Sequence, residues 1–300
     1  MNKLLLALLV ISSIILFLFF LCLGFGEYIR QTCTLQKLPD VNTKNSSFSL
    51  TTIPSRINEM EPTIESLVKQ NPKTIYLNVP FKFKKTGENY VIPEWLDKYT
   101  NTGEVTLIRP EDKGPATKFL GLFEYKGIIE PDEYICIVDD DQIYNENLLS
   151  NLIKKADKFN GERVISVLVE LTPPRIEGWC GYIFKKKLLD DIIHYPHPSE
   201  CYFVDDPWIT SYFMDKGIKI TRLFHSNVFT VSLRKTPKDV FQFLNNIFYK
   251  EPAVSGYNSK NPLWKIRKPD EDLKCTQVLH KDNQELLIQH NKTILENIRD

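Results

Sequence analysis

The sequence has no net charge, because 38 lysine and arginine residues balance 38 aspartate and glutamate residues over 300 positions. A balanced chain offers no overall field to a polyanion, which disfavours nucleic acid as a partner. The sequence also has no internal repeat and no low-complexity block, which disfavours solenoid architectures and long biased segments. Its aromatic content of 12% is typical of a packed chain rather than a disordered one.

None of the six cysteines forms a CxxC pair, which excludes a zinc knuckle built on that spacing. Cys180 and Cys201 are candidates for a disulfide in an oxidising compartment, although the sequence leaves the pairing open. Two N-glycosylation sequons begin at Asn45 and Asn291, and they favour exposure to such a compartment. The cysteines are Cys22, Cys33, Cys136, Cys180, Cys201 and Cys275.

The run from Leu4 to Leu23 contains no charged residue. A helix of this length reaches about 30 Å, which is the hydrocarbon thickness of a bilayer. The run is longer than the apolar part of a secretory signal, and no A-x-A cleavage pattern follows it. We therefore expect an uncleaved, single membrane-spanning anchor over residues 4–23. The slight charge bias of Lys3 over Glu27 and Arg30 favours a cytoplasmic amino terminus.

Apolar runs with strand and helix patterns alternate along the rest of the chain. This alternation predicts βαβ units, and therefore an α/β fold with a mostly parallel sheet flanked by helices. The segment 250–274 is polar and contains proline, which predicts a loop. The expected strands are residues 48–52, 74–80, 104–110, 134–138, 163–171 and 218–224, and the expected helices are residues 61–71, 114–125, 145–159, 203–217, 236–249 and 283–298.

Three consecutive aspartates, Asp139 to Asp141, directly follow the apolar strand 134–138. Ligands of open α/β sheets bind at the carboxyl ends of the strands. Alternate residues of an extended chain share a side, so Asp139 and Asp141 are expected to face one ligand. Two converging carboxylates favour Mg²⁺ or Mn²⁺ with positions open to phosphate oxygens. The alternative is a solvated acidic turn before a helix, where negative charge is also favourable.

This arrangement resembles the GT-A glycosyltransferases, whose Asp-x-Asp motif at the end of a central strand holds a divalent cation on the diphosphate of a nucleotide sugar. The resemblance covers residues 48–230 and implies a GT-A, Rossmann-like fold, a Mn²⁺ or Mg²⁺ cofactor and a UDP- or GDP-linked donor. It implies a cytoplasmic tip and anchor over residues 1–25, a stem over 26–47, a catalytic domain over 48–235 and a helical extension over 236–300.

The resemblance also assigns residues around the donor nucleotide. The end of the first strand lies beside the base and ribose in that family, which makes Thr51, Thr52 and Arg56 nucleotide-side candidates, with Asp140 beside the cation. Lys118 lies near the amino end of its expected helix, where anions are favoured. The alternatives are an exposed charge for Arg56 and a surface lysine for Lys118.

The resemblance also implies that one later loop borders the donor and acceptor sugars. In the family a loop of glycine and aromatic residues lies there, which here is Gly178, Trp179 and Gly181. Aromatic faces suit the apolar side of a pyranose, and glycine lets the backbone approach a ligand. The alternative is that Trp179 belongs to the core.

Inverting members of the family need a carboxylate base for the acceptor hydroxyl. The pair Asp205 and Asp206 occurs at the expected position, although Asp206 also suits the N-cap of a helix that begins at Pro207. His225 is implied as a further metal ligand, or it is a structural histidine.

The function implied is metal-dependent transfer of a sugar from a nucleotide sugar to an acceptor hydroxyl of a glycan or protein, with inversion. The expected protein is a type II, single-pass membrane protein with a lumenal catalytic domain. The Q-x-x-R-W motif of many processive synthases is absent, which disfavours that class. Two alternatives stay open: a non-catalytic glycan-binding module that uses Trp179 and Tyr182, and a metal-dependent nucleotidyl or phosphoryl transferase.

Overall fold

The computed structural model describes residues 35–171, 174–224, 254–257 and 271–279. The chain divides into two compact units, residues 36–223 with 253–300 and residues 1–35 with 224–252. Only Leu35 and Phe224 of the second unit are described, so the description below concerns the first. The expected anchor, His225, the sequon at Asn291 and the expected helices 236–249 and 283–298 lie outside the described residues. Within the described ranges, none of the helices has the length and apolarity to span a membrane.

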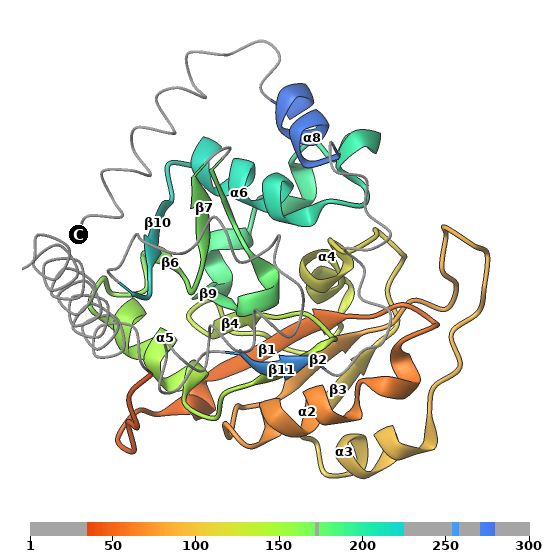
Figure 1. Ribbon diagram of the computed structural model, residues 1–300, viewed down its shortest axis with the longest axis horizontal. Helices are drawn as coiled ribbons and strands as arrows, with labels where there is room; N and C mark the ends of the chain where they lie inside the picture. Colours follow the sequence, from red (N-terminus) through yellow and green to blue (C-terminus); the bar gives the residue numbers. More distant parts are fainter. Residues whose placement is uncertain (1–34, 172–173, 225–253, 258–270, 280–300) are drawn as a thin grey trace, which may run out of the picture. The chain divides into compact units, whose positions relative to one another are not determined.

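A seven-stranded sheet with the order β10-β6-β9-β4-β1-β2-β3 forms the centre of this unit (Figure 1). The pairs β1–β2, β1–β4, β2–β3 and β6–β10 are parallel, which confirms a mostly parallel, Rossmann-like α/β sheet. Strand β9 differs, because it runs antiparallel to both β4 and β6. The strands are β1 (Ser46–Thr51), β2 (Ile75–Asn78), β3 (Val105–Ile108), β4 (Tyr134–Ile137), β6 (Arg163–Ser166), β9 (Tyr182–Lys185) and β10 (Lys219–Arg222).

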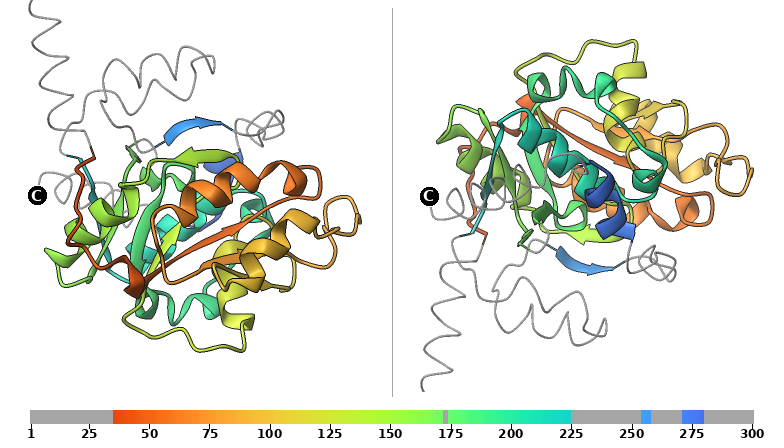
Figure 2. Two further views of the ribbon diagram at one scale, coloured as in Figure 1. Left: turned by 90° about the horizontal axis from the view of Figure 1, so that it is seen from below. Right: turned by 90° about the horizontal axis from the view of Figure 1, so that it is seen from above.

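Helices lie on both faces of the sheet. The views from below and from above show α2 on one face and α4 with α6 on the other (Figure 2), while α5 packs against β6 and β9. Pro62 occupies the first turn of α2, as expected. The longer helices are α2 (Glu61–Val68), α4 (Thr117–Glu124), α5 (Leu148–Asp157) and α6 (Asp205–Asp215), and α3 (Asp97–Asn101) is a short one.

Large aromatic side chains fill the space between the sheet, α4 and α6. Phe119 of α4 lies 6.4 Å from Tyr182 and 6.3 Å from Trp208 between ring centroids. Phe184 and Phe213 approach to 5.4 Å. All five side chains are fully buried, and burial of an apolar side chain of this size stabilises the fold by about 1.5–3 kcal/mol. This packing fixes α6 and β9 relative to each other.

Two expectations for secondary structure were wrong. The strand expected over residues 163–171 ends at Ser166, and a separate strand β7 (Val169–Leu171) pairs antiparallel with β8 (Pro174–Ile176). The segment expected as a loop contains β11 (Val254–Tyr257), which pairs with β5 (Gln142–Tyr144). Both strand pairs lie outside the main sheet. The prediction relied on long apolar runs, and these short strands were not identified by it.

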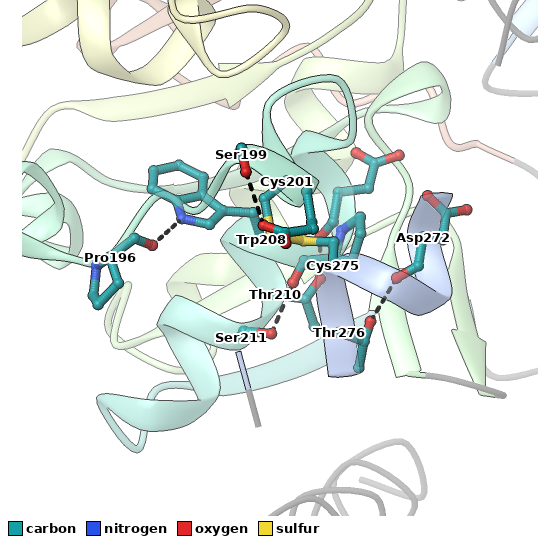
Figure 3. Close-up of a disulfide and its surroundings, with 12 residues drawn as sticks. Pro196, Ser199, Cys201, Trp208, Thr210, Ser211, Asp272, Cys275 and Thr276 are labelled. Atoms are coloured by element: carbon teal, nitrogen blue, oxygen red, sulfur yellow. Dashed lines mark hydrogen bonds between the residues drawn. A yellow bond between two sulfur atoms is a disulfide. The ribbon is translucent and has the colours of Figure 1, made fainter. Parts of the chain in front are cut away.

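Cys201 forms a disulfide with Cys275 of helix α8 (Glu271–Leu279), as Figure 3 shows. The suggested pair of Cys180 with Cys201 is therefore wrong, and Cys180, like Cys136, is a buried cysteine outside this disulfide. The sequence could not identify the pair because α8 itself was not expected. The disulfide connects the start of α6 with a helix 74 residues further along the chain.

The end of the expected stem is attached to the larger unit. The Gln36 amide donates to the Asn151 side chain of α5 at 3.0 Å, and Asn151 donates in return to the Gln36 carbonyl at 2.7 Å. Asn45, which begins the first sequon, is exposed. Gln36 is thus bonded to α5, and the sequon asparagine stays accessible.

Candidate active site

The acidic motif lies at the carboxyl end of the sheet, as the order of elements predicted. Strands β1 and β4 are parallel neighbours, with Ser49 opposite Ile137. Thr52 follows β1 and Asp139 follows β4, so the two segments lie side by side beyond the strand ends. This is the edge at which open α/β sheets bind their ligands.

Arg56 pairs with two of the three aspartates. Its Nη1 lies 2.9 Å from Asp141 Oδ2, and its Nη2 contacts Asp140 Oδ1. The Thr52 hydroxyl donates to the other oxygen of Asp140. The Arg56 side chain is 4% exposed, so the alternative of an exposed charge was wrong. The loop after β1 and the turn after β4 are thereby joined by charge-assisted hydrogen bonds, which are stronger than neutral ones.

The charge state of this cluster follows from burial and from its partners. Burial raises the pKa of Asp140 to about 6, although Arg56 acts in the opposite direction. Burial also raises the pKa of Asp141 above its usual value, again opposed by Arg56. Burial alone would lower the pKa of Arg56, but Asp140 and Asp141 raise it above its usual value. Arg56 therefore stays charged and holds the two carboxylates in place.

Lys118 connects the third aspartate with helix α6. Its Nζ lies 2.8 Å from Asp139 Oδ1 and 2.8 Å from Asp205 Oδ2. Lys118 is 3% exposed, so the alternative of a surface lysine was wrong. Burial alone would lower the pKa of Lys118, but Asp139 and Asp205 raise it above its usual value. The Ser49 hydroxyl donates to the Lys118 carbonyl at 2.7 Å, which fixes the start of α4 against β1.

The paired aspartates of α6 differ in their contacts. The helix begins at Asp205, and Val204 is its cap, so the interpretation of Asp206 as the N-cap was wrong. The Gly178 amide donates to Asp206 Oδ1 at 3.1 Å. Burial, followed by the charge of Asp205, raises the pKa of Asp206 well above its usual value. Burial therefore favours the protonated form of Asp206 more than it would in an exposed carboxyl, while Asp205 faces the Lys118 ammonium.

The glycine and aromatic loop closes this side of the site. A Cβ atom at Gly178 would lie 2.9 Å from Lys118 Nζ and 3.2 Å from Asp206 Oδ1, so the close approach requires glycine. Gly181 has a φ of 97°, a conformation that also favours glycine. The Trp179 side chain is half-buried, and its carbonyl accepts from the Tyr144 hydroxyl at 3.1 Å.

Two tyrosines near the carboxylates were not expected there as catalytic-site residues. The Tyr144 hydroxyl accepts the Asp139 amide at 2.8 Å, which fixes the turn after β4. The Tyr182 hydroxyl is buried and has no hydrogen-bond partner within the described ranges. Burial, followed by the charges of Asp205 and Asp206, raises its pKa well above the usual value, so Tyr182 remains a donor. No sequence pattern marks either phenol, because each depends on the packing of β9 or β5.

Other predicted site residues lie elsewhere or face away. The Thr51 hydroxyl donates to the Asn78 carbonyl at 2.7 Å, so it is engaged within the sheet rather than by a ligand. His225 lies outside the described residues. The structure therefore brings together most of the predicted site, namely Thr52, Arg56, Lys118, Asp139, Asp140, Asp141, Gly178, Trp179, Asp205 and Asp206.

The fit to a divalent cation is partial. The expectation that Asp139 and Asp141 face one ligand is not met, because Asp141 contacts Arg56 and Gln142 instead. Among the described residues, no group of three acidic, histidine or cysteine side chains is placed to hold a metal ion. The donor chemistry nevertheless suits a hard cation, since carboxylate oxygens outnumber the cationic groups here. Asp139, whose side chain is 36% exposed, is the carboxylate open to such an ion.

Comparisons with known proteins add little weight. No protein-family model and no curated protein sequence matches the chain. Similar solved structures include the mannosyltransferase PcManGT from Pyrobaculum calidifontis in complex with GDP-Man and Mn²⁺, with a TM-score of 0.42, 15% identity and coverage of 91% of this chain and 81% of that one. They also include 4-diphosphocytidyl-2C-methyl-D-erythritol synthase (TM-score 0.41, 13% identity, 67% and 96% covered) and a mycobacterial protein (0.40, 13%, 71% and 80%). Because these TM-scores are low, none of the similarities carries an argument about this chain.

Proposed function

We propose that the chain is a metal-dependent glycosyltransferase that moves a sugar from a nucleotide-sugar donor to an acceptor hydroxyl with inversion. The observation that supports this proposal is the contact of Lys118 with both Asp139 and Asp205 at 2.8 Å. The Lys118 ammonium thus contacts both Asp139, which we assign to the donor side, and Asp205, which we assign to the acceptor side. Group transfer between two ligands needs both sides within reach of one reacting centre.

The donor would lie over the ends of β1 and β4. Thr52, Arg56 and Asp140 form a buried, mutually bonded wall there, which suits the nucleotide side. Asp139 would hold the divalent cation, with His225 as the other predicted ligand. When bound, the cation supplies neutralisation of the leaving diphosphate. The Lys118 ammonium lies beside the same carboxylate and would add positive charge where the diphosphate departs.

The acceptor would approach from α6 and the Gly178 loop. Burial and the charge of Asp205 raise the pKa of Asp206, which disfavours its ionised form and makes it the less available proton acceptor of the pair. Asp205, with a side chain 11% exposed, is then the base that takes the proton of the acceptor hydroxyl. A base on the side opposite the leaving group gives inversion. The buried Tyr182 hydroxyl, whose pKa the charges of this pair raise, would serve as a donor to a substrate oxygen.

A donor screen tests the proposal. The full chain in detergent is incubated with UDP- and GDP-linked sugars, with Mn²⁺, with Mg²⁺ and with a chelator, and released nucleoside diphosphate and glycoside are measured. We expect release with one donor class and loss on chelation, restored by the metal. Asp139→Asn should abolish the metal response. Formation of a nucleoside monophosphate or a sugar phosphate would instead support a nucleotidyl or phosphoryl transferase, and binding of glycan without turnover would support a binding module.

We also propose that the larger unit lies on the lumenal side of a membrane, anchored through residues 4–23. The Cys201–Cys275 disulfide supports an oxidising compartment, and the exposed Asn45 is accessible to glycosylation. Expression in secretory-pathway membranes tests this, because a glycosidase-sensitive mass shift that Asn45→Gln reduces is expected. Digestion of the whole domain by protease added to sealed vesicles would contradict it.

A further inference from the structure

We propose that helix α8 completes the candidate active site, because Asp272 and the disulfide at Cys275 position the segment from Arg175 to Gly178 against Asp206. The role given to Asp206 rests on the proposed function, whereas the physical connection stands on the contacts themselves. The segment that α8 belongs to was expected to lie beyond the catalytic domain. We infer instead that α8 belongs to that domain and positions residues of the candidate site.

The first connection is covalent. Cys275 is bonded to Cys201, and their Cα atoms are 4.7 Å apart. Cys201 lies in the turn before α6, where the Val204 amide donates to its carbonyl at 3.0 Å. Figure 3 shows the disulfide beside Trp208 of α6. Helix α8 is therefore attached just ahead of the pair Asp205 and Asp206.

The second connection is ionic and largely buried. Asp272 Oδ2 of α8 lies 2.9 Å from Arg175 Nη1, and Arg175 Nε donates to Glu177 Oε1 at 2.6 Å. The side chains of Asp272, Arg175 and Glu177 are 15%, 8% and 0% exposed. Removal of one partner from such a buried chain of charges is destabilising. Asp272 therefore fixes the direction of the Arg175 side chain.

The Arg175 segment carries this constraint to the site. The Ile176 amide donates to Thr210 Oγ1 at 3.0 Å, and Thr210 Oγ1 donates to the Asp206 carbonyl at 2.7 Å. Two residues later the Gly178 amide donates to Asp206 Oδ1 at 3.1 Å. A displacement of Arg175 would thus change the donor that faces the Asp206 carboxyl.

The segment needs an external support because the main sheet does not hold it. Strand β8, which contains Arg175, pairs with β7 in a separate two-stranded sheet. Isolated two-stranded ribbons are marginally stable in water. Helix α8 supplies that support through Asp272, and α6 supplies it through Thr210. Arg175 and Asp272 are accordingly positioning residues, since neither touches the carboxylates at which the proton moves.

Three variants of the full chain test the inference: Asp272→Asn, the double variant Cys201→Ser with Cys275→Ser, and the control Asp191→Asn. The control removes an exposed ion pair of similar geometry, 2.8 Å between Asp191 and Lys216. Amide hydrogen exchange is followed in a peptide covering residues 175–181. We expect exchange there to accelerate roughly two- to tenfold in the first two variants, with no change in the control.

Turnover supplies the second measurement. We expect kcat to fall by roughly two- to tenfold in Asp272→Asn, since the effect reaches the site through the hydrogen bond to Asp206. KM for the donor should stay the same, because the donor wall is on other elements. Unchanged exchange in residues 175–181 of Asp272→Asn would overturn the inference. Acceleration confined to α8, without acceleration in residues 175–181, would overturn it as well.

Failure of the proposed function would look different. If no nucleotide sugar supports transfer by the wild type, the proposed function falls, but hydrogen exchange still reports whether α8 orders residues 175–181. If transfer occurs and the Asp272 variant equals the control in both measurements, only the positioning role falls.

Discussion

Exchanging Asp205 and Asp206 one at a time for asparagine separates the base from its neighbour. Burial and the charge of Asp205 raise the pKa of Asp206, which favours its protonated form. Asparagine has nearly the same shape as a protonated aspartate, and its amide oxygen can still accept the Gly178 amide that Asp206 accepts at 3.1 Å. Asp206→Asn should therefore keep most of the activity, whereas Asp205→Asn removes the proton acceptor.

The expected magnitudes differ enough to decide. A general base accelerates a reaction by about 10²–10⁴-fold, which is about 3–5 kcal/mol of barrier, so Asp205→Asn should lose that factor in kcat. Asp206→Asn alters at most one neutral hydrogen bond, about 0.5–1.5 kcal/mol, or roughly two- to tenfold. Lys118 keeps its contact with Asp139 at 2.8 Å in either variant, so neither change should unfold the protein.

Initial rates at saturating donor and acceptor, measured from pH 6 to pH 9 with melting temperatures as a control for folding, provide the assay. Above its raised pKa, Asp206 of the wild type ionises beside Asp205, and Asp206→Asn cannot follow. The two pH profiles should therefore coincide where Asp206 is protonated and separate as the pH rises. If Asp206→Asn at pH 7 loses as much activity as Asp205→Asn, with both melting temperatures unchanged, Asp206 is the base and the reasoning from burial is refuted.

Three further changes test the surroundings. Lys118→Met leaves Asp139 and Asp205 without this ammonium, so the free energy of unfolding should fall by about 3 kcal/mol. The melting temperature should then fall by roughly 6–12 °C. An unchanged melting temperature would show that the pairing adds no stability. Gly178→Ala places a Cβ 2.9 Å from Lys118 Nζ and should lower kcat about tenfold with a melting temperature within about 2 °C of the wild type; wild-type kcat would contradict the close approach. The double variant Cys201→Ser with Cys275→Ser frees a connection of 74 residues and should lower the free energy of unfolding by about 4 kcal/mol; equal denaturant midpoints for both proteins would refute this.

The elements that the sequence predicted correctly are those with long apolar patterns. The run at residues 134–138 corresponds to β4, and the stripe of Leu148, Leu149 and Leu152 is buried along α5. Strand β9 was missed, although Tyr182 and Phe184 are fully buried. This four-residue strand lies between β4 and β6 in the sheet. Its pairing with those two strands does not follow from the local pattern of apolar residues.

For the candidate site, the sequence predicted location better than pairing. The aspartates were expected at the end of a central strand, and they lie there because the strand ends where apolar residues stop. Which basic side chain contacts each aspartate depends on how α4 and the loop after β1 pack at that edge of the sheet. Arg56 and Lys118 were therefore foreseen as candidates, but not as buried partners of Asp141 and Asp139.

Strand β9 has a consequence for how the molecule assembles. It is the shared neighbour of β4 and β6, and it joins the pair β6–β10 to the group β4-β1-β2-β3 within the main sheet. Until residues 182–185 are synthesised and inserted, the two halves of this sheet have no common ladder. Tyr182 opens that same strand and lies beside the α6 carboxylates. Insertion of β9 therefore both closes the sheet and brings Tyr182 to the candidate site, so loosening of β9 would separate the two halves of the sheet and move this phenol away from the α6 carboxylates.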